Sequence, residues 1–354
     1  MKKTKEEGKY KKFDYYTLGG DIGGTNTKLG IFGIKNESPA LLNYFHYKSS
    51  ELKNISDAVN EAVNYAKINY KTKVENSCLA VAGPVSAKRD FAKLTNEEWA
   101  VSSKEIKNKT GLNPIIINDF EAVGFGINVL RKKDFKVIKK GQQVKKAPIA
   151  LIGAGTGLGK SILIYDKHMQ AYIPISSEGG HADFPALNEG EANLLKFVKK
   201  FRGLNGNISY EHLLSGHGIE SIYYFLRKSE KYNKTEYSET IDNSNSKPEL
   251  ISKYKNEDDA CRETFGLFAG FYARAARNFA LESLARGGVY IGGGIAMKNE
   301  GIFGKNFIAE FENNIKLKKI LKNIPVYLIK NYYAGLFGAG FAALRKMEKL
   351  KFYT

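Results

Sequence analysis

The sequence is poor in cysteine and in long apolar runs. Only Cys78 and Cys261 occur among the 354 residues, and they stand far apart. Two isolated cysteines cannot form a disulfide framework or supply the closely spaced ligands of a zinc site, so a reducing compartment fits. No apolar stretch reaches the length of a membrane span, and no hydrophobic signal core follows Met1. We therefore expect a cytoplasmic protein with no membrane partner.

Acidic residues are the minority charge. Lys and Arg number 55 against 37 Asp and Glu, which gives a formal net charge of +18. The basic residues are scattered, and the densest run, residues 1–12, is too short for a DNA-binding domain. We predict a disordered basic arm over residues 1–14 and no nucleic-acid partner. The hydrophobic content of 43% is ordinary for a globular protein, and the length allows two domains.

Glycine is concentrated after an apolar strand in the segment Leu18–Ile31, which reads LGGDIGGTNTKLGI. A strand, a glycine turn and a returning strand can present backbone N–H groups to phosphate, and an acidic residue beside them would face Mg²⁺. The segment is neither a P-loop nor a dinucleotide-binding turn, because no Gly-Lys-Ser/Thr and no helix follows the glycines. The alternative is an ordinary glycine-rich hairpin. The candidate phosphate and metal residues are Asp21, Gly23, Gly24, Thr25 and Asn26.

The same pattern returns in the second half of the chain. An apolar strand near Ile149–Ile152 is followed by Gly155, Thr156 and Gly157, and then by a second strand. Two such hairpins form a degenerate internal duplication, which makes an accidental turn less probable as an explanation. A third glycine turn follows the strand near Tyr290, and its bare backbone could admit an adenine or a ribose. Its residues are Gly292, Gly293 and Gly294.

Polar residues that could bind a ligand or take part in catalysis occur at three other points. Asn118 and Asp119 end a buried strand, where open α/β sheets bind ligands, although Asp119 could simply cap the next helix. Glu178 and His181 are separated by two glycines, so both side chains can converge on one small polar target. Glu211 lies on a short helix that Ser209 could cap.

Periodicity predicts the remaining framework. Apolar spacing indicates helices within residues 55–66, 191–201, 265–286 and 335–350. Residues 131–146 are basic and turn-rich, and residues 228–247 are polar and low in complexity, so we predict a connector and a loop there.

In combination, these motifs resemble the bacterial-type glucokinases, a family of the sugar kinase, heat-shock chaperone and actin superfamily. The resemblance runs from about Thr17 to about Leu344, and its motifs keep their order: DIGGTN, LTNxxW, INDFEAV, GAGTGLG, EGGHADF and GGVYIGGGI. The cysteine-rich zinc motif of the repressor and open-reading-frame sugar kinases is missing. The resemblance implies an α/β fold with two actin-like (ribonuclease H-like) domains, an interdomain cleft and a homodimer. The small domain would comprise residues 15–130 plus about 334–354, and the large domain residues 131–333.

The resemblance also implies roles for the candidate residues. Asp119 would be the catalytic base for the 6-hydroxyl of glucose, and Asp21 would reach Mg²⁺ through water. The three glycine turns would hold ATP. The residues implied around the sugar are Asn96, Asn118, Asp119, Glu178, His181 and Glu211. Lys28 and Lys160 adjoin the first two glycine turns, and we expect both side chains to be solvated.

The leading expectation is therefore ATP-dependent phosphorylation of glucose to glucose 6-phosphate, the entry step of glycolysis. Two alternatives stay open at the level of sequence. One is a kinase for another hexose or an amino sugar, because the shape of the sugar pocket is not readable from the residues. The other is a non-catalytic, actin-like regulator that senses sugar on the same scaffold.

Overall fold

The structure is a computed structural model that describes residues 13–94, 99–229 and 231–345. The chain divides into two compact units. Unit 1 consists of Met1–Asp134, Leu163–Ser176 and Asn331–Thr354, and unit 2 of Phe135–Ile162 and Ser177–Lys330. The segment Leu163–Ser176 thus clusters with unit 1, whereas the family resemblance placed it in the large domain.

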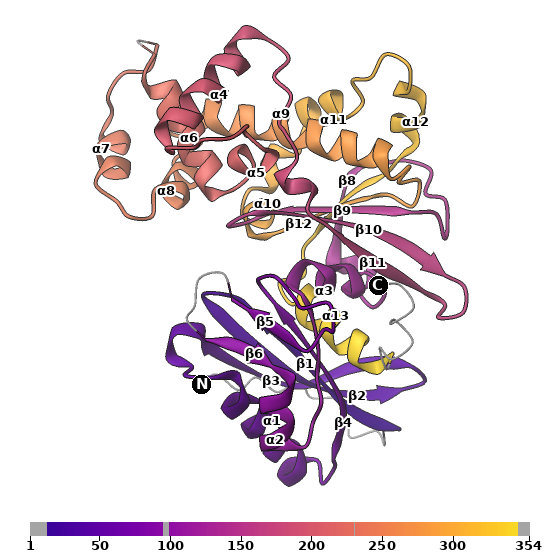
Figure 1. Ribbon diagram of the computed structural model, residues 1–354. Helices are drawn as coiled ribbons and strands as arrows, with labels where there is room; N and C mark the ends of the chain where they lie inside the picture. Colours follow the sequence, from indigo (N-terminus) through magenta and orange to yellow (C-terminus); the bar gives the residue numbers. More distant parts are fainter. Residues whose placement is uncertain (1–12, 95–98, 230, 346–354) are drawn as a thin grey trace. The chain divides into compact units, whose positions relative to one another are not determined.

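Unit 1 is built on a five-stranded sheet with the strand order β3-β2-β1-β4-β7 (Figure 1). The first three strands form an antiparallel meander, and β4 and β7 then add parallel to β1. The strands are β1 (Tyr15–Ile22), β2 (Asn26–Lys35), β3 (Ser38–Lys48), β4 (Val74–Val81) and β7 (Ile115–Asn118).

Both faces of this sheet are covered by helices (Figure 1). In β4, Leu79 and Val81 point into a core shared with α1 and α2, whereas Cys78 and Ala80 point into a core shared with α3 and α13. This alternation follows from the two-residue period of a strand, and it explains why the strands read as continuous apolar runs. The helices are α1 (Ile55–Asn69), α2 (Ser103–Thr110), α3 (Asp119–Gly126) and α13 (Ala334–Leu344).

Local sequence signals fix two of these helices. Asn54 caps α1 by accepting a hydrogen bond from the Asp57 N–H, and the predicted apolar face of α1 is buried. Helix α13 approaches α3 closely. The contact is at Gly338, where a Cβ would overlap the carbonyl oxygen of Ala122. The described part of the closing helix ends at Leu344, so the predicted extension to residue 350 lies mostly outside the described residues.

The remaining elements of unit 1 are short. A two-stranded ribbon pairs β5 with β6, and two 3₁₀ turns follow β3 and α3. These elements are β5 (Phe91–Lys93), β6 (Ala100–Ser102), η1 (Ser49–Glu51) and η2 (Lys132–Asp134).

A second sheet has the order β11-β10-β9-β12-β13-β8, in which β12 pairs parallel with β9 and β13. Most of β11 and the end of β10 belong to the segment Leu163–Ser176, and the other strands belong to unit 2. Three strands consecutive in the chain are thus followed by two parallel strands, as in unit 1, which confirms the predicted internal duplication. The strands are β8 (Phe135–Lys139), β9 (Ile149–Ala154), β10 (Leu158–Asp166), β11 (Ala171–Ser177), β12 (Val289–Gly292) and β13 (Val326–Ile329).

The prediction of a connector over residues 131–146 was wrong at β8, which pairs antiparallel with β13. Its basic residues suggested a solvated segment, yet Lys139 is buried. The Lys139 Nζ donates to the carbonyl oxygens of Leu321, Lys322 and Ile324, at the end of α12. A lysine that satisfies the last carbonyl groups of a helix needs no solvent.

Helices cover the second sheet. The predicted long apolar helix is α9, which is buried along most of its length and packs against α6 and α11 (Figure 1). The predicted loop over residues 228–247 was wrong in part, because α7 forms there with Thr235 as its cap. The helical elements are η3 (Gly179–His181), α4 (Glu189–Phe201), α5 (Tyr210–Leu213), α6 (Gly216–Arg227), α7 (Glu236–Asp242), α8 (Lys247–Lys253), α9 (Asp259–Glu282), α10 (Gly294–Lys298), η4 (Glu300–Ile302), α11 (Lys305–Phe311) and α12 (Lys318–Asn323).

Across the described ranges, no helix is both long enough and apolar enough to span a membrane.

Candidate active site

The first glycine turn lies between β1 and β2 and is held by β3 and the residue after it. The Gly23 N–H donates to the Asn26 carbonyl at 2.9 Å, and the Ser49 hydroxyl donates to the Gly23 carbonyl at 2.5 Å. His46 hydrogen-bonds to the Asn26 side chain at 2.8 Å, and the Ser49 N–H donates to the Thr25 carbonyl. The turn that contains Gly23, Gly24, Thr25 and Asn26 is therefore a fixed structure, as a phosphate-binding turn must be.

Asp21 faces Lys28 across the two strands of this hairpin. The two residues are register partners, and the Lys28 Nζ lies 3.2 Å from Asp21 Oδ2. The ammonium group also lies 4.0 Å from the ring centroid of Tyr332. Only 8% of the Lys28 side chain is exposed, so the prediction that it is solvated was wrong. Burial between a carboxylate and an aromatic face explains the difference.

Asn118 and Asp119 stand at the junction of β7 and α3. Asn118 is the cap of α3, since its Oδ1 accepts hydrogen bonds from the N–H groups of Phe120 and Glu121. Asp119 is the first helical residue, and its Oδ1 also accepts from the Phe120 N–H. The capping alternative thus belongs chiefly to Asn118, whose amide nitrogen can still donate to a ligand.

The electrostatic setting of Asp119 differs from that of an ordinary surface carboxylate. The pKa of Asp119 is raised to about 6, chiefly by burial and secondly by the nearby charge of Asp21, against the hydrogen bond from the Phe120 N–H. A carboxylate with a pKa near neutrality is a better proton acceptor than one with a pKa near 4. Such a pKa is typical of general bases.

One ion pair beside this junction was not anticipated. The Arg89 guanidinium nitrogen donates to both carboxylate oxygens of Glu121, at 2.9 and 3.1 Å. Glu121 is buried in the first turn of α3, and the pair ties the loop after β4 to the start of that helix. The motif INDFEAV contains Glu121, but no local pattern identifies an arginine 32 positions away as its partner.

In unit 2, the second glycine turn is joined to Glu211. The Leu158 N–H donates to Glu211 Oε2 at 2.8 Å, and a Cβ at Gly157 would lie only 2.5 Å from that oxygen. The Gly216 N–H donates to the Gly155 carbonyl at 3.0 Å, so the turn is also held by the start of α6. A side chain at position 157 would force the Glu211 carboxylate to shift.

The second and third glycine turns lie side by side. Strand β12 pairs with β9 so that Gly292 is opposite Gly153, which places both turns at the carboxyl ends of neighbouring parallel strands. Gly293 has a φ of +89°, and a Cβ there would overlap the Ala154 carbonyl oxygen. By contrast, no atom of the described residues lies within 4 Å of a Cβ built at Gly155 or Gly294. Packing does not explain those two glycines, whereas close approach of a ligand to bare backbone would.

Glu178, His181 and Glu211 form a cluster, as the sequence analysis predicted. His181 Nε2 lies 3.8 Å from Glu178 Oε2, and His181 Nδ1 lies 3.9 Å from Glu211 Oε1. The His181 side chain is 62% exposed and that of Glu178 91%, so both can reach a ligand from solvent. One imidazole with a carboxylate on either side is a set of donors and acceptors suited to a polyhydroxylated molecule.

Backbone pairing brings this cluster together. The Tyr210 N–H donates to the Ala182 carbonyl at 3.0 Å, and the Phe184 N–H donates to the Ile208 carbonyl at 2.8 Å. The segment after His181 therefore runs beside the segment before Glu211. The sequence predicted both motifs but not this pairing, which depends on two segments nearly 30 residues apart.

The structure also bears on Lys160, on Asn96 and on grouped metal ligands. Lys160, expected to be solvated, is buried with only 4% of its surface exposed, so that expectation was wrong. Asn96 lies outside the described residues. Among the residues that the structure describes, no three His, Cys, Asp or Glu side chains are grouped as metal ligands.

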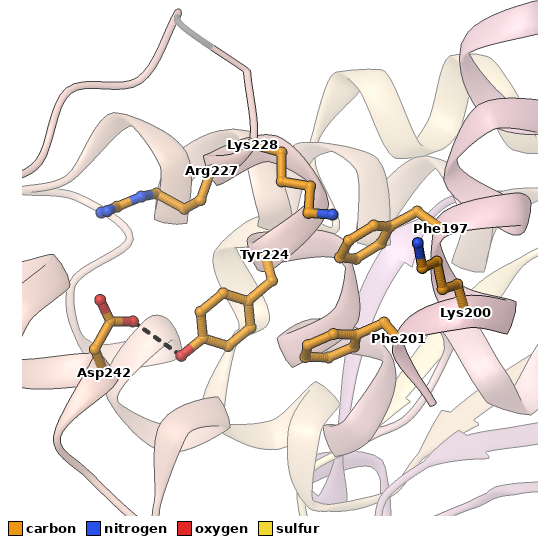
Figure 2. A pocket seen from close by; sticks show the side chains of 7 residues that line it. All are labelled: Phe197, Lys200, Phe201, Tyr224, Arg227, Lys228 and Asp242. Carbon is orange, nitrogen blue, oxygen red and sulfur yellow. Dashed lines mark hydrogen bonds between the residues drawn. The ribbon is translucent and has the colours of Figure 1, made fainter. Parts of the chain in front are cut away.

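A cavity of about 460 Å³ on the helices of unit 2 contains none of the predicted site residues (Figure 2). The Lys228 Nζ lies 4.8 Å from the ring centroid of Phe197, and the Tyr224 hydroxyl donates to Asp242 at 2.9 Å. The lining residues are Phe197, Lys200, Phe201, Tyr224, Arg227, Lys228 and Asp242.

Comparison with known proteins tests the resemblance. The sequence profile described as Glucokinase matches residues 18–346. The chain belongs to the glucokinase family. A glucokinase of Nostoc sp. is 36% identical over 345 residues, covering 93% of this chain and 98% of the relative. A glucokinase of Pectobacterium atrosepticum is 32% identical over 335 residues, covering 94% and 98%. The family match and these relatives support a glucokinase-type enzyme and do not favour the regulator.

Solved structures agree with the fold. A glucokinase from an Antarctic psychrotroph superposes with a TM-score of 0.78 at 27% identity, covering 94% of this chain and 99% of that one. A glucokinase of Balamuthia mandrillaris, solved in complex with glucose, gives a TM-score of 0.73 at 20% identity, covering 93% of each chain. A glucokinase of Streptomyces griseus, in complex with glucose and AMPPNP, gives 0.62 at 21% identity, covering 93% of this chain and 99% of that one. These likenesses confirm the predicted actin-like α/β fold class.

Proposed function

We propose that this glucokinase family member transfers the γ-phosphoryl group of ATP to the 6-hydroxyl of glucose, with Asp119 as the general base. The observation that carries the assignment of the base is the pKa of Asp119, which burial raises to about 6 at the end of β7. In the reaction, the 6-oxygen forms a bond to the γ-phosphorus while the bond from that phosphorus to the bridging oxygen of ADP breaks. The hydroxyl proton passes to the Asp119 carboxylate.

The three glycine turns are proposed to hold ATP. Gly155 and Gly294 have open space where a side chain would stand, which suits contact between a ligand and bare backbone. We assign the phosphates to the turns at Gly23–Asn26 and Gly155–Gly157, and the adenosine to Gly292–Gly294. Backbone donors fixed before the ligand arrives need no rearrangement when charge develops on the phosphates.

Mg²⁺ fits Asp21. The carboxylate of Asp21 is partly buried beside the first glycine turn, and a single carboxylate with phosphate oxygens and waters is the donor set that Mg²⁺ prefers. Asp21 would hold the ion through water, and the bound ion would offset negative charge on the phosphates. Lys28 is already paired with Asp21 and adds a second positive charge at the same place.

The sugar is assigned to Glu178, His181 and Glu211, together with the amide of Asn118 and with Asn96. The carboxylate oxygens accept hydrogen bonds from hydroxyl groups, and the amide donates to one. A sugar that leaves one of these groups unpaired would lose about 1–3 kcal/mol of binding free energy. We also propose, from the family resemblance, a cytoplasmic homodimer that works at the entry of glycolysis.

The first test is an ADP-release assay with MgATP and glucose, mannose, fructose or N-acetylglucosamine, on the wild type and the Asp119→Asn variant. We expect turnover with glucose that falls about 10²- to 10⁴-fold in the variant. Asp259→Asn is the matched control, because that carboxylate is 79% exposed and lies outside the site.

Three outcomes are informative. Turnover with only another sugar would keep the mechanism and refute glucose as the substrate. ATP hydrolysis that needs no sugar and survives in Asp119→Asn would refute the kinase mechanism. Equal activity of Asp119→Asn and Asp259→Asn would refute Asp119 as the base.

A further inference from the structure

Lys160 is a buried cation beneath the proposed sugar site. It lies on β10, two residues after Leu158, and only 4% of its surface is exposed. Within the described residues, its Nζ forms no hydrogen bond and no ion pair. Instead it lies 4.6 Å from the ring centroid of Tyr210 and 5.2 Å from that of Phe279. The charge of Glu282 attracts the ammonium group only from beyond ion-pair distance. Burial of an ammonium group with no carboxylate in contact is costly, so this arrangement needs a physical reason.

The loop that carries Glu178 and His181 rests directly on this side chain. A Cβ at Gly179 would lie 3.1 Å from Lys160 Cδ and 3.5 Å from its Nζ. The next residue, Gly180, is pressed onto the carbonyl of Leu158, which a Cβ would overlap. Contact with β10 therefore explains the two glycines between Glu178 and His181: Gly179 packs on the Lys160 side chain, and Gly180 packs on the Leu158 carbonyl.

The same ammonium group contacts the segment that carries Glu211. Tyr210 immediately precedes Glu211, and its hydroxyl accepts a hydrogen bond from the Asn278 amide at 2.8 Å. Its N–H donates to the Ala182 carbonyl, one residue after His181. Lys160 thus touches both halves of the cluster: the glycine loop through its stem, and the start of α5 through the Tyr210 ring.

We infer that Lys160 is a positioning residue of the sugar site, whose ammonium group, held on the faces of Tyr210 and Phe279, fixes Glu178, His181 and Glu211 at their mutual distances. This inference rests on the proposed function, in which those three side chains bind glucose. The positive charge is essential to the role because an apolar side chain of the same length would fill the space but would not be attracted to the two aromatic faces.

Lys160→Met tests the charge, because methionine keeps much of the apolar stem and removes the ammonium group. Glucose affinity is measured by isothermal titration calorimetry without nucleotide, and KM and kcat by ADP release. We expect the Kd and KM for glucose to rise about 3- to 30-fold, the range that a cation–π contact supplies. The kcat and the KM for ATP should stay within about twofold, because neither Asp119 nor the glycine turns have changed.

Two further variants separate positioning from simple packing. Lys160→Arg keeps a cation over the rings and should restore most of the glucose affinity, which a merely space-filling role would not require. Lys305→Met, at an exposed lysine of the same unit, is the control and should match the wild type. If Lys160→Met does not fold, Phe279→Leu removes one aromatic face while leaving the lysine in place, and should raise the Kd for glucose in the same direction.

Glu211→Gln distinguishes failure of this inference from failure of the proposed function. Wild-type glucose affinity in Lys160→Met (or in Phe279→Leu, where that substitution replaces it), with weakened binding in Glu211→Gln, would overturn the role of Lys160 and leave the sugar site intact. Wild-type affinity in Glu211→Gln would refute the proposed sugar site itself. A loss of kcat with unchanged glucose Kd in Lys160→Met would also overturn the inference.

Discussion

Asp21 and Lys28 are register partners on β1 and β2, and their side chains form an ion pair of 3.2 Å beside the first glycine turn. The charge of Asp21 is also one cause of the raised pKa of Asp119. The carboxylate assigned to Mg²⁺ and the carboxylate assigned to proton transfer therefore influence each other. This coupling is open to measurement through the pH dependence of the reaction.

The fall of kcat/KM at low pH, the acid limb of the pH profile, should reflect protonation of Asp119. Since the base must be ionised and its pKa is about 6, kcat/KM should fall about tenfold per pH unit below 6 and be constant above about 7. Initial rates with glucose between pH 5 and 8 measure this limb. A flat profile down to pH 5 would contradict the assignment.

Two substitutions should move this limb in opposite directions. Asp21→Asn removes a negative charge near Asp119, so the apparent pKa should fall. Lys28→Met removes the cation beside Asp21, so the apparent pKa should rise. Lys48→Met, an exposed lysine on β3, is the control that should leave the limb in place. Shifts of the same sign in both variants would show that the two carboxylates do not interact as the structure indicates.

Asp119→Asn should not destabilise the protein. The folded pKa of Asp119 lies above its ordinary value, so the folded state binds a proton more tightly than the unfolded state. Between about pH 4 and 6 this binding is lost as pH rises, and at pH 7 the ionised carboxylate costs stability. Asparagine removes that cost, and the free energy of unfolding at pH 7.5 should rise by about 1–3 kcal/mol. Urea unfolding measures it, and a clear decrease would contradict the prediction.

His212 should make α5 sensitive to acid. Its Nδ1 accepts a hydrogen bond from the Ser209 N–H, and burial lowers the pKa of the imidazole. Because the folded pKa is depressed, the unfolded state binds the proton more readily. Stability is therefore fully present above the unfolded value of about 6.5 and falls as pH drops below it. Comparing urea unfolding at pH 7.5 and 5.5, the wild type should lose more stability than His212→Ala, and an equal loss would contradict this role.

Glycine substitutions should separate folding from nucleotide binding. Gly294→Ala and Gly155→Ala meet no described atom within 4 Å, so both variants should fold normally yet raise the KM for ATP at least about fivefold, if the ligand approaches bare backbone as proposed. Gly293→Ala should instead destabilise the fold, because its φ is +89° and its Cβ would overlap the Ala154 carbonyl. Gly206→Ala, also in open space, is the control. Wild-type KM values for ATP in the first two variants would refute the proposed nucleotide contacts.

Much of the candidate site was predictable because its signals are local. A glycine turn after an apolar strand, a polar pair at a strand end, and a capping residue before a helix each act over a few residues. Asn54 and Ser209 begin their helices where the sequence places them, whereas the cap of α3 is Asn118 and not Asp119. The order of these motifs was enough to indicate the family.

The sequence by itself determined the strands that lead into the glycine turns and the long apolar helices α1 and α9, since these follow from short-range periodicity and backbone preference. The tertiary structure alone decided which charges are buried. Lys28 lies against the ring of Tyr332, Lys160 against the ring of Tyr210, and Lys139 at the end of α12. Whether a lysine is solvated depends on which distant segment folds over it, and no local pattern contains that information.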